Sequence, residues 1–293
     1  MKYAWIDKLR DVYPLEALCA TLAVSPSGYS HWKGSGGPRK RLSDAALLVL
    51  IRSIHAETKS AYGAPRIWRE LRDRGHPASK ERVRKLMQVH GIRGRHKRRY
   101  KATTDSKHSF PVAPNLLDQK FRTYRPDLIY TADITYIPTV EGWLYLAVVL
   151  DLHTRMVVGW AMGERMTRKL TMDALRMARF RRRPKPGAVH HSDRGSQYCS
   201  HDYQALLKQY GMTASMSRKG NCWDNAVTES FFNSLKNERV HHMRYATRAE
   251  AKQDLFEYIE VFYNRKRRHS ALGYRSPADF HSAWLDQHCK QAA

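Results

Sequence analysis

The spacing of apolar residues changes near Pro126, and this change limits the chain to two kinds of folded unit. Before that point, apolar residues recur at three- and four-residue spacing, as in residues 43–57, which is typical of amphipathic helices. After it, runs rich in β-branched and aromatic residues predict three successive strands and then strands that alternate with helices. The expected strands are residues 129–137, 143–150, 156–162, 188–191 and 213–217. This order predicts an α/β layer fold with a mixed sheet.

The N-terminal part of the chain predicts only helices. Residues 14–32 have the pattern of a helix, a turn and a second helix. Further helices are expected at residues 43–57, 64–74 and 79–90. The last of these carries Arg82, Arg84 and Lys85, and a three-helix unit with a basic last helix is the helix-turn-helix pattern that enters the DNA major groove. Ordinary solvated helix faces are the alternative interpretation of these charges.

A basic run without acids follows this unit at residues 93–101. It contains Arg95, Lys97, Arg98 and Arg99, and its lack of apolar periodicity predicts a linker that tracks phosphates. The expected organisation is a helix-turn-helix-like segment at 1–37, a helical DNA-binding domain at 38–100, a basic and extended linker at 101–124, a core with C-terminal helices at 125–284 and a tail at 285–293.

The charge balance indicates a polyanionic partner. The 52 Lys and Arg residues exceed the 27 Asp and Glu residues, which gives a net charge of +25. A membrane surface or a structural RNA would satisfy this charge as well as DNA would. The longest apolar run, residues 143–150, is too short to span a bilayer, and charges interrupt the N-terminus where a signal peptide would be apolar. Four scattered cysteines without a C-x-x-C pair favour a cytosolic protein with reduced thiols.

Pairs of acids separated by 35 residues are candidates for a metal site, but the spacing alone does not identify one. The chain contains five such pairs: Asp105–Glu141, Asp193–Glu229, Asp202–Glu238, Asp224–Glu260 and Glu250–Asp286. Only two have a basic residue seven positions later, namely Lys236 after Glu229 and Arg267 after Glu260. Asp193 follows a short apolar strand, where α/β sheets open their ligand crevice. Asp224 has instead the position of a helix N-cap, so the Asp193 pair is favoured.

The helix that carries Glu229 offers one polar stripe. Lys236 lies two turns after Glu229, and Asn225 lies one turn before it, so the three share a side. This stripe predicts a metal ligand at Glu229, a phosphate contact at Lys236 and a base or sugar contact at Asn225. A solvated surface lysine is the alternative for Lys236.

A third acid is needed, and two strand residues compete for the role. Asp133 lies inside the strand 129–137, whereas Asp151 ends a strand at a hairpin, where aspartate is a common turn residue. The placement favours Asp133. Two strand-borne aspartates and a helix-borne glutamate can hold two Mg²⁺ ions and cut or join a phosphodiester.

At these residues the chain closely resembles the transposases of the IS3 family, specifically the product of the downstream reading frame. The matching segments are residues 24–29, 62–63, 132–137, 191–198, 224–238, 263–274 and 276–277. The resemblance implies a ribonuclease H-like, retroviral integrase-type core with a catalytic triad of Asp133, Asp193 and Glu229. The commonest family form has Thr before the first aspartate, where this chain has Ala132. That residue is not an expected ligand.

The resemblance also implies an activity and partners. The expected protein is a DNA transposase that binds insertion-sequence ends and catalyses 3′-end cleavage and strand transfer with two Mg²⁺ ions, or with Mn²⁺ as a substitute. Expected partners are transposon-end DNA, target DNA, further copies of the chain in a dimer or tetramer, and an upstream-frame product as fusion or separate subunit. The expected location is the bacterial cytoplasm, at the nucleoid, with no membrane partner. The alternatives are a catalytically silent helix-turn-helix regulator and a ribonuclease H-type nuclease.

Overall fold

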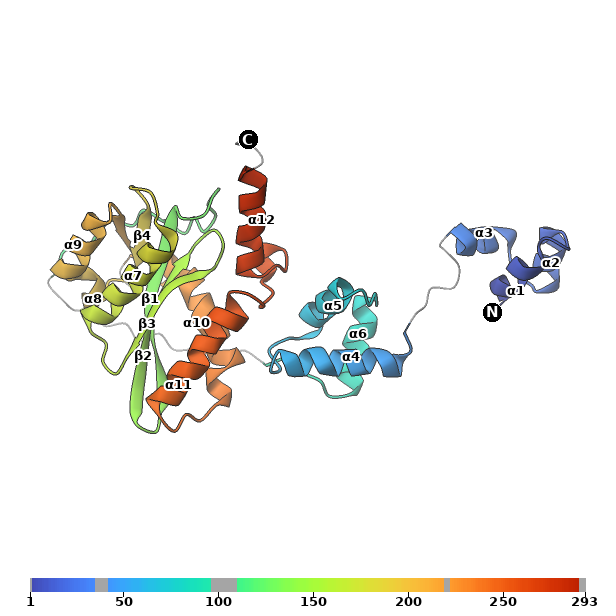
Figure 1. Cartoon of the computed structure of the whole chain (residues 1–293), viewed down its shortest axis with the longest axis horizontal. Coiled ribbons are helices and arrows are strands. Elements are labelled where there is room, and N and C mark those ends of the chain that lie inside the picture. The colour runs from blue at the N-terminus through green and yellow to red at the C-terminus, as the bar shows by residue number, and fades with distance from the viewer. Residues whose placement is uncertain (1, 35–41, 96–109, 219–221, 290–293) are drawn as a thin grey trace. The chain divides into compact units, whose positions relative to one another are not determined.

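The computed structural model describes residues 2–34, 42–95, 110–218 and 222–289 (Figure 1). The chain divides into two compact units. The first comprises Met1–Ile54 and Ile67–Ile92, and the second comprises His55–Arg66 and Arg93–Ala293. Residues 55–66, which lie within the stretch predicted as one helical domain, therefore pack with the second unit.

The first unit is helical, as the sequence predicts. Its first three helices are α1 (Lys2–Leu9), α2 (Leu15–Thr21) and α3 (Pro26–Gly34). They meet around Ile6, Cys19 and Tyr29, and α2 with α3 forms the predicted helix, turn and helix.

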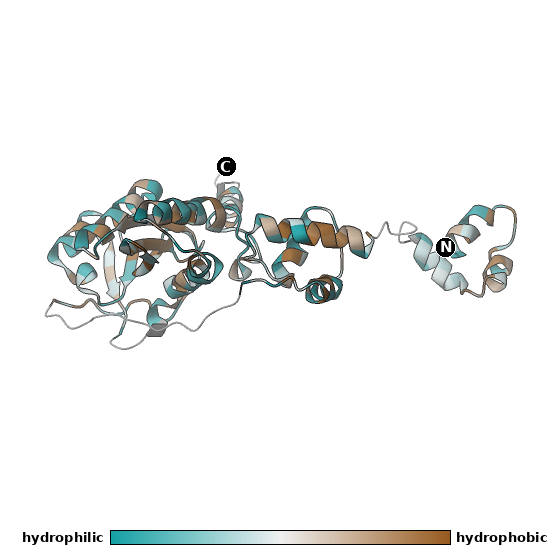
Figure 2. Ribbon diagram, turned by 90° about the horizontal axis from the view of Figure 1, so that it is seen from below, coloured by the Kyte–Doolittle hydropathy of each residue, from teal (hydrophilic) through white to brown (hydrophobic). Residues whose placement is uncertain are grey.

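Three further helices follow in the chain: α4 (Asp44–Glu57), α5 (Ala64–Asp73) and α6 (Lys80–Val89). Each buries an apolar stripe, which for α4 is visible as brown segments along the ribbon in Figure 2. The Ser79 side chain accepts a hydrogen bond from the N–H of Arg82 at 3.2 Å, so Ser79 caps α6.

The second unit contains a five-stranded sheet. Its strands are β1 (Ile129–Thr139), β2 (Gly142–Asp151), β3 (Val157–Gly163), β4 (Val189–Ser192) and β5 (Thr213–Met216). Their order in the sheet is β3-β2-β1-β4-β5. The first three strands pair antiparallel, whereas β4 runs parallel to β1 and β5 parallel to β4. The predicted mixed sheet is confirmed.

Helices cover both faces of this sheet (Figure 1). One face carries α7 (Arg168–Arg182), α8 (Ser196–Cys199) and α9 (His201–Gln209), and the other carries α10 (Ala226–Glu238), α11 (Arg248–Phe256) and the π-helical η3 (Glu257–Tyr263). The interior strand β2 alternates between these layers, since Ala147 and Val149 face the α7 side while Leu146, Val148 and Leu150 face the α10 side.

The remaining elements are short or C-terminal. They are η1 (Cys222–Asn225), η2 (Val240–His242), η4 (Ser270–Leu272) and α12 (Pro277–Cys289). Thr247 caps α11, because its Oγ1 accepts the N–H of Glu250 at 3.1 Å. None of the helices within the described ranges is long and apolar enough to span a bilayer.

Candidate active site

Asp133 lies on β1, and Asp193 directly follows the last residue of the neighbouring parallel strand β4. The register of β1 with β4 pairs Thr131 with His191, two residues before each aspartate. Side chains alternate along a strand, so Asp133 shares the face of Thr131. Thr131 contacts α10, which makes this the face that α10 covers.

Two hydrogen bonds fix the start of α10 on β1. Thr228 Oγ1 donates to Thr131 Oγ1 at 2.7 Å, and Asn225 Nδ2 donates to the carbonyl oxygen of Ala132 at 3.2 Å. Glu229 directly follows Thr228, so these contacts hold Glu229 beside Asp133. Asn225, for which the sequence predicts a base or sugar contact, has its side chain buried and bonded to the strand.

Solvent reaches all three acids, although their neighbours are covered. Asp133, Asp193 and Glu229 are each partly exposed, whereas Thr131 and Thr228 are fully buried. Asp193 Oδ1 accepts the N–H of Gly195 at 2.9 Å, and a β-carbon added at Gly195 would lie only 3.0 Å from that oxygen. Glycine at this position therefore lets the loop after β4 fold back onto the Asp193 carboxylate.

The three carboxyl groups interact electrostatically. Burial raises the pKa of Asp133 well above its ordinary value, and the nearby Asp193 and Glu229 carboxylates raise it further, against the Ile134 N–H and Lys236. Burial also raises the pKa of Glu229. Within the described part of the chain, no three His, Cys, Asp or Glu side chains form a ready metal-binding group. Asp133 nevertheless lies close enough to Asp193 and Glu229 for their charges to disfavour its ionised form.

Lys236 is buried rather than solvated. Its side chain is 6 % exposed, and Nζ lies 4.8 Å from the ring centroid of Tyr136 on β1. Burial lowers the pKa of Lys236, and Asp133 opposes that shift. The surface-lysine alternative is wrong, because the ammonium group is held between an aromatic face and the acidic site.

The rival acids have structural partners. Both carboxylate oxygens of Asp151 are engaged, with the N–H of Asp127 at 3.0 Å and with the N–H and hydroxyl of Thr154 at 2.9 and 2.5 Å. Glu260 accepts from Trp160 Nε1 at 2.7 Å and pairs with Arg181 at 2.6 Å. Asp151 is confirmed as a turn residue, and Glu260 braces α7 to η3.

Asp224 is not the helix cap that the sequence predicts. It lies in η1, where its carboxylate accepts from the Arg218 guanidinium at 2.9 Å and from Asn115 Nδ2 at 2.9 Å. Hydrogen bonds from Arg218 lower the pKa of Asp224 to about 2. The residue thus fixes the segment before β1 against the loop that precedes α10.

His190 and His191 pack in the sheet. His191 pairs with the hydroxyls of Ser215 and Ser217 at 2.8 and 3.2 Å, and His190 pairs with Tyr203 at 2.9 Å. Burial lowers the pKa of His190 to about 3 and that of His191 to about 4, so both rings are neutral near pH 7.

The predicted DNA-contacting residues of the N-terminal half divide into two groups. Arg84 and Lys85 are exposed on α6, where Arg84 pairs with Glu81 at 2.6 Å. Arg82 instead bonds Asp44 Oδ1 and the carbonyl oxygen of Leu42, each at 2.6 Å.

Arg95 also has a partner in the fold, because its guanidinium donates to the carbonyl oxygen of Glu238. The guanidinium groups of Arg82 and Arg95 therefore both make hydrogen bonds within the chain. Lys97, Arg98 and Arg99 lie outside the described residues.

The sequence reasoning missed Thr131 and Thr228 as positioning residues. Each belongs to a matched segment or lies beside one, but nothing in the local pattern shows that their hydroxyls meet across the helix–strand interface.

Three stretches of the chain match models of known protein families. Residues 123–222 and 229–285 match models described as "Integrase core domain", and residues 42–100 match a model described as "HTH-like domain". A likeness in fold, with a TM-score of 0.42 and 16 % identity, extends to the integrase catalytic core domain of HTLV-2 and covers 55 % of this chain and 99 % of that chain.

Two relatives match nearly end to end. The chain is 48 % identical over 263 residues to the "Insertion element IS600 uncharacterized 31 kDa protein" of Shigella sonnei, covering 90 % of this chain and 97 % of the relative. It is 42 % identical over 283 residues to "Transposase InsF for insertion sequence IS3A" of Escherichia coli K12, covering 96 % of this chain and 98 % of the relative. The mixed sheet is that of an integrase core, and the chain belongs to the IS3 family of insertion-sequence transposases.

Proposed function

We propose that this transposase cleaves the 3′ ends of its element and joins them to target DNA at one site formed by Asp133, Asp193 and Glu229. The observation that carries the proposal is the approach of these acids to one another: Asp133 lies on β1, Asp193 follows the adjacent parallel strand β4, and Glu229 lies on a helix bonded to β1. Family membership supplies the substrate class, DNA.

The residues present fit a divalent metal of the hard, oxygen-binding kind. Three carboxylates offer only oxygen donors, the ligand type that such ions prefer. Asp133, Asp193 and Glu229 would hold two Mg²⁺ ions, or Mn²⁺ in their place. The ions would supply activation of an attacking oxygen and stabilisation of the leaving 3′-oxygen.

The chain itself contributes placement and charge. Thr228 and Asn225 fix Glu229 against β1, so the glutamate does not have to be ordered when DNA binds. Lys236, held over Tyr136, supplies a positive charge near Asp133 and would attract a phosphate of the terminal DNA to the acids. Arg84 and Lys85 remain the exposed candidates for contacts with DNA in the N-terminal half.

The partners that we propose are transposon-end DNA, target DNA and further copies of this chain in a dimer or tetramer. An upstream-frame product, as fusion or separate subunit, would complete the active form. The net charge of +25 supports a nucleic-acid partner for every such assembly.

A joining assay with labelled DNA ends tests this function. With Mg²⁺ the full chain is expected to nick the 3′ strand and to transfer that strand to a second duplex, and a chelator is expected to stop both reactions. Binding without either reaction would indicate a silent regulator. Cleavage of RNA–DNA hybrids without joining would indicate a ribonuclease H-type nuclease.

A further inference from the structure

The last residue of α10, Glu238, lies at the centre of a buried polar cluster away from the acidic site. Its side chain is 7 % exposed, and both carboxylate oxygens have partners. Arg267 donates to both, with Nη2 2.6 Å from Oε1 and Nε 2.7 Å from Oε2. Tyr258 adds a hydrogen bond to Oε2 at 2.9 Å. Such a two-point guanidinium–carboxylate pair fixes orientation as well as position.

The cluster ties α10 to the segment that follows η3. Arg267 is 4 % exposed, and its Nη2 also donates to Ser234 Oγ, one turn before Glu238, at 3.0 Å. Its guanidinium lies over the ring of Tyr263, 5.5 Å from the centroid. The C-terminal half of α10 is thus held at two successive turns by one arginine.

A third segment contacts the cluster. We call it the connector and define it as residues 55–66 and 93–95 of the second unit. Arg66 Nη1 lies 3.3 Å from Glu238 Oε1, and the Arg95 guanidinium donates to the Glu238 carbonyl oxygen. The hydroxyl of the buried Tyr62 donates to the carbonyl oxygen of Lys266 at 3.1 Å and accepts the N–H of Arg268 at 2.8 Å.

The ionised Glu238 carboxylate offsets part of the positive charge of Arg267 and Arg66. Burial raises the pKa of Glu238, but Arg267 and Arg66 outweigh it and leave that pKa below its ordinary value, while burial together with Arg267 lowers the pKa of Arg66. Glu238 therefore lies between the buried Arg267 and the half-buried Arg66, two cations that would otherwise repel each other.

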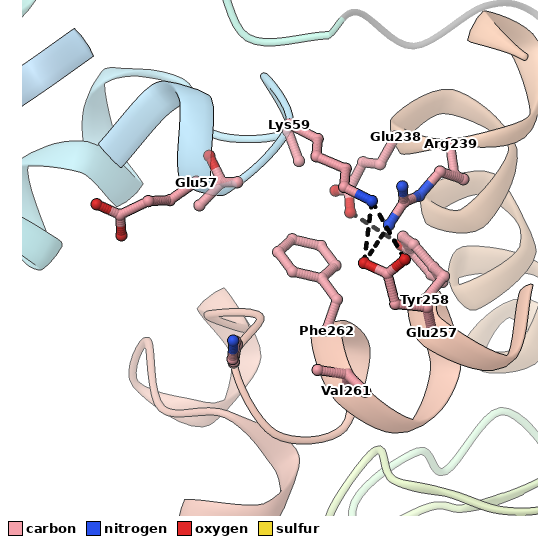
Figure 3. A pocket seen from close by; sticks show the side chains of 11 residues that line it. Glu57, Lys59, Glu238, Arg239, Glu257, Tyr258, Val261 and Phe262 are labelled. Carbon is pink, nitrogen blue, oxygen red and sulfur yellow. Dashed lines mark hydrogen bonds and ion pairs between the residues drawn. The ribbon is translucent and has the colours of Figure 1, made fainter. Parts of the chain in front are cut away.

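A more exposed group of ion pairs lies in a pocket that Glu238 also lines. Figure 3 shows Lys59 and Arg239 converging on the carboxylate of Glu257, at 2.9 and 3.6 Å. The Lys59 and Glu257 side chains are each 48 % exposed, so solvent screens this pair. It offers a control in the connector itself.

We propose that Glu238 is a positioning residue that couples the connector to the catalytic face of α10. The connector contains the last residues of α4 and the first residues of α5, and it belongs to the stretch that matches the HTH-like domain. Glu229 lies nine residues before Glu238 on the same helix, about 14 Å along its axis. Thr228 and Asn225 hold the start of this helix and the connector holds its end, so the connector's contact adds to how firmly Glu229 is held beside Asp133.

The test separates binding from the rate of the chemical step in the full chain. Arg66→Ala removes the connector's contact with the Glu238 carboxylate and leaves the Arg267–Glu238 pair. With saturating labelled end DNA and Mg²⁺, its single-turnover cleavage rate is expected to fall about tenfold, the effect of losing one charge-assisted hydrogen bond. The Kd for that DNA in chelator is expected to stay within about twofold. Arg66→Lys keeps a cation and is expected to restore part of the rate, whereas Lys59→Ala is expected to change neither quantity.

Thermal unfolding of each variant shows whether a slower rate results from a loss of folding. A second variant with a smaller change tests the same contact region. Tyr62→Phe removes one hydroxyl and keeps the ring, and it is expected to slow cleavage in the same direction. Normal rates in both Arg66→Ala and Tyr62→Phe would overturn the coupling, as would a weakened Kd with an unchanged rate at saturation. The inference rests on the proposed role of Glu229, but different results contradict the inference and the proposed function. An active Glu229→Gln variant contradicts the proposed function. An inactive Glu229→Gln variant together with a fully active Arg66→Ala variant contradicts only the coupling.

Discussion

Glu229→Gln is expected to lower the Mg²⁺-dependent rates of 3′-end cleavage and strand transfer by about a thousandfold or more, roughly 4 kcal/mol of barrier. Glutamine keeps the size of the side chain but removes the charge that the metal requires. The start of α10 would stay in place, because Thr228 and Asn225, not Glu229, bond to β1. The measurement is a single-turnover assay with a labelled transposon end.

Binding and folding supply the controls for Glu229→Gln. Affinity for end DNA in chelator is expected to be unchanged or slightly higher, because the variant removes a negative charge near the phosphates. Glu257→Gln changes a glutamate of the same unit that pairs with Lys59 at the surface, and it is expected to keep activity. Comparable rates for Glu229→Gln and Glu257→Gln would contradict the assignment of Glu229 to the site.

Asp133→Asn is expected to stabilise the metal-free protein while abolishing its activity. The pKa of Asp133 is raised in the fold above its unfolded value of about 3.9, so the native state binds this proton more tightly. The contribution of Asp133 to stability is therefore present at low pH and is lost as pH rises through the raised pKa. Asparagine does not titrate and can still accept the Ile134 N–H that Asp133 Oδ1 accepts at 2.7 Å.

Thermal unfolding in chelator at pH 8 tests this expectation. The variant should gain about 1 kcal/mol in the free energy of unfolding, a value discounted for the partial exposure of the carboxylate. Added Mg²⁺ should raise the Tm of the wild type, since it binds only the native site, and should leave Asp133→Asn unchanged. A lower Tm for the variant in chelator, or an equal response of both proteins to Mg²⁺, would contradict the account.

Features set by local pattern could be predicted from the sequence. All five strands and the main helices follow from periodicity and from caps such as Ser79 and Thr247. The choice of Asp133 over Asp151 also followed from local position, inside a strand rather than at its end. In the structure, both carboxylate oxygens of Asp151 accept hydrogen bonds from Asp127 and Thr154 around a turn.

Features set by distant partners could not be predicted. Arg82 resembled a DNA contact because its helix is basic, yet it bonds Asp44 and Leu42, about forty positions earlier in the chain. Arg95 reaches the end of α10, and Asp224 finds Arg218 and Asn115 instead of a helix N-terminus. No local pattern encodes such pairs, because they exist only after the sheet brings separate segments together.

The central claim, that these carboxylates hold the catalytic metal, is tested most directly by changing the metal preference of one ligand. Asp193→Cys replaces a carboxylate by a thiolate, which binds Mg²⁺ poorly and softer divalent ions better. In the strand-transfer assay we expect no product with Mg²⁺, a measurable rate with Mn²⁺, and no product with either ion for Asp193→Ala. Strand transfer at the wild-type rate by Asp193→Cys or Asp193→Ala with Mg²⁺ would contradict the account.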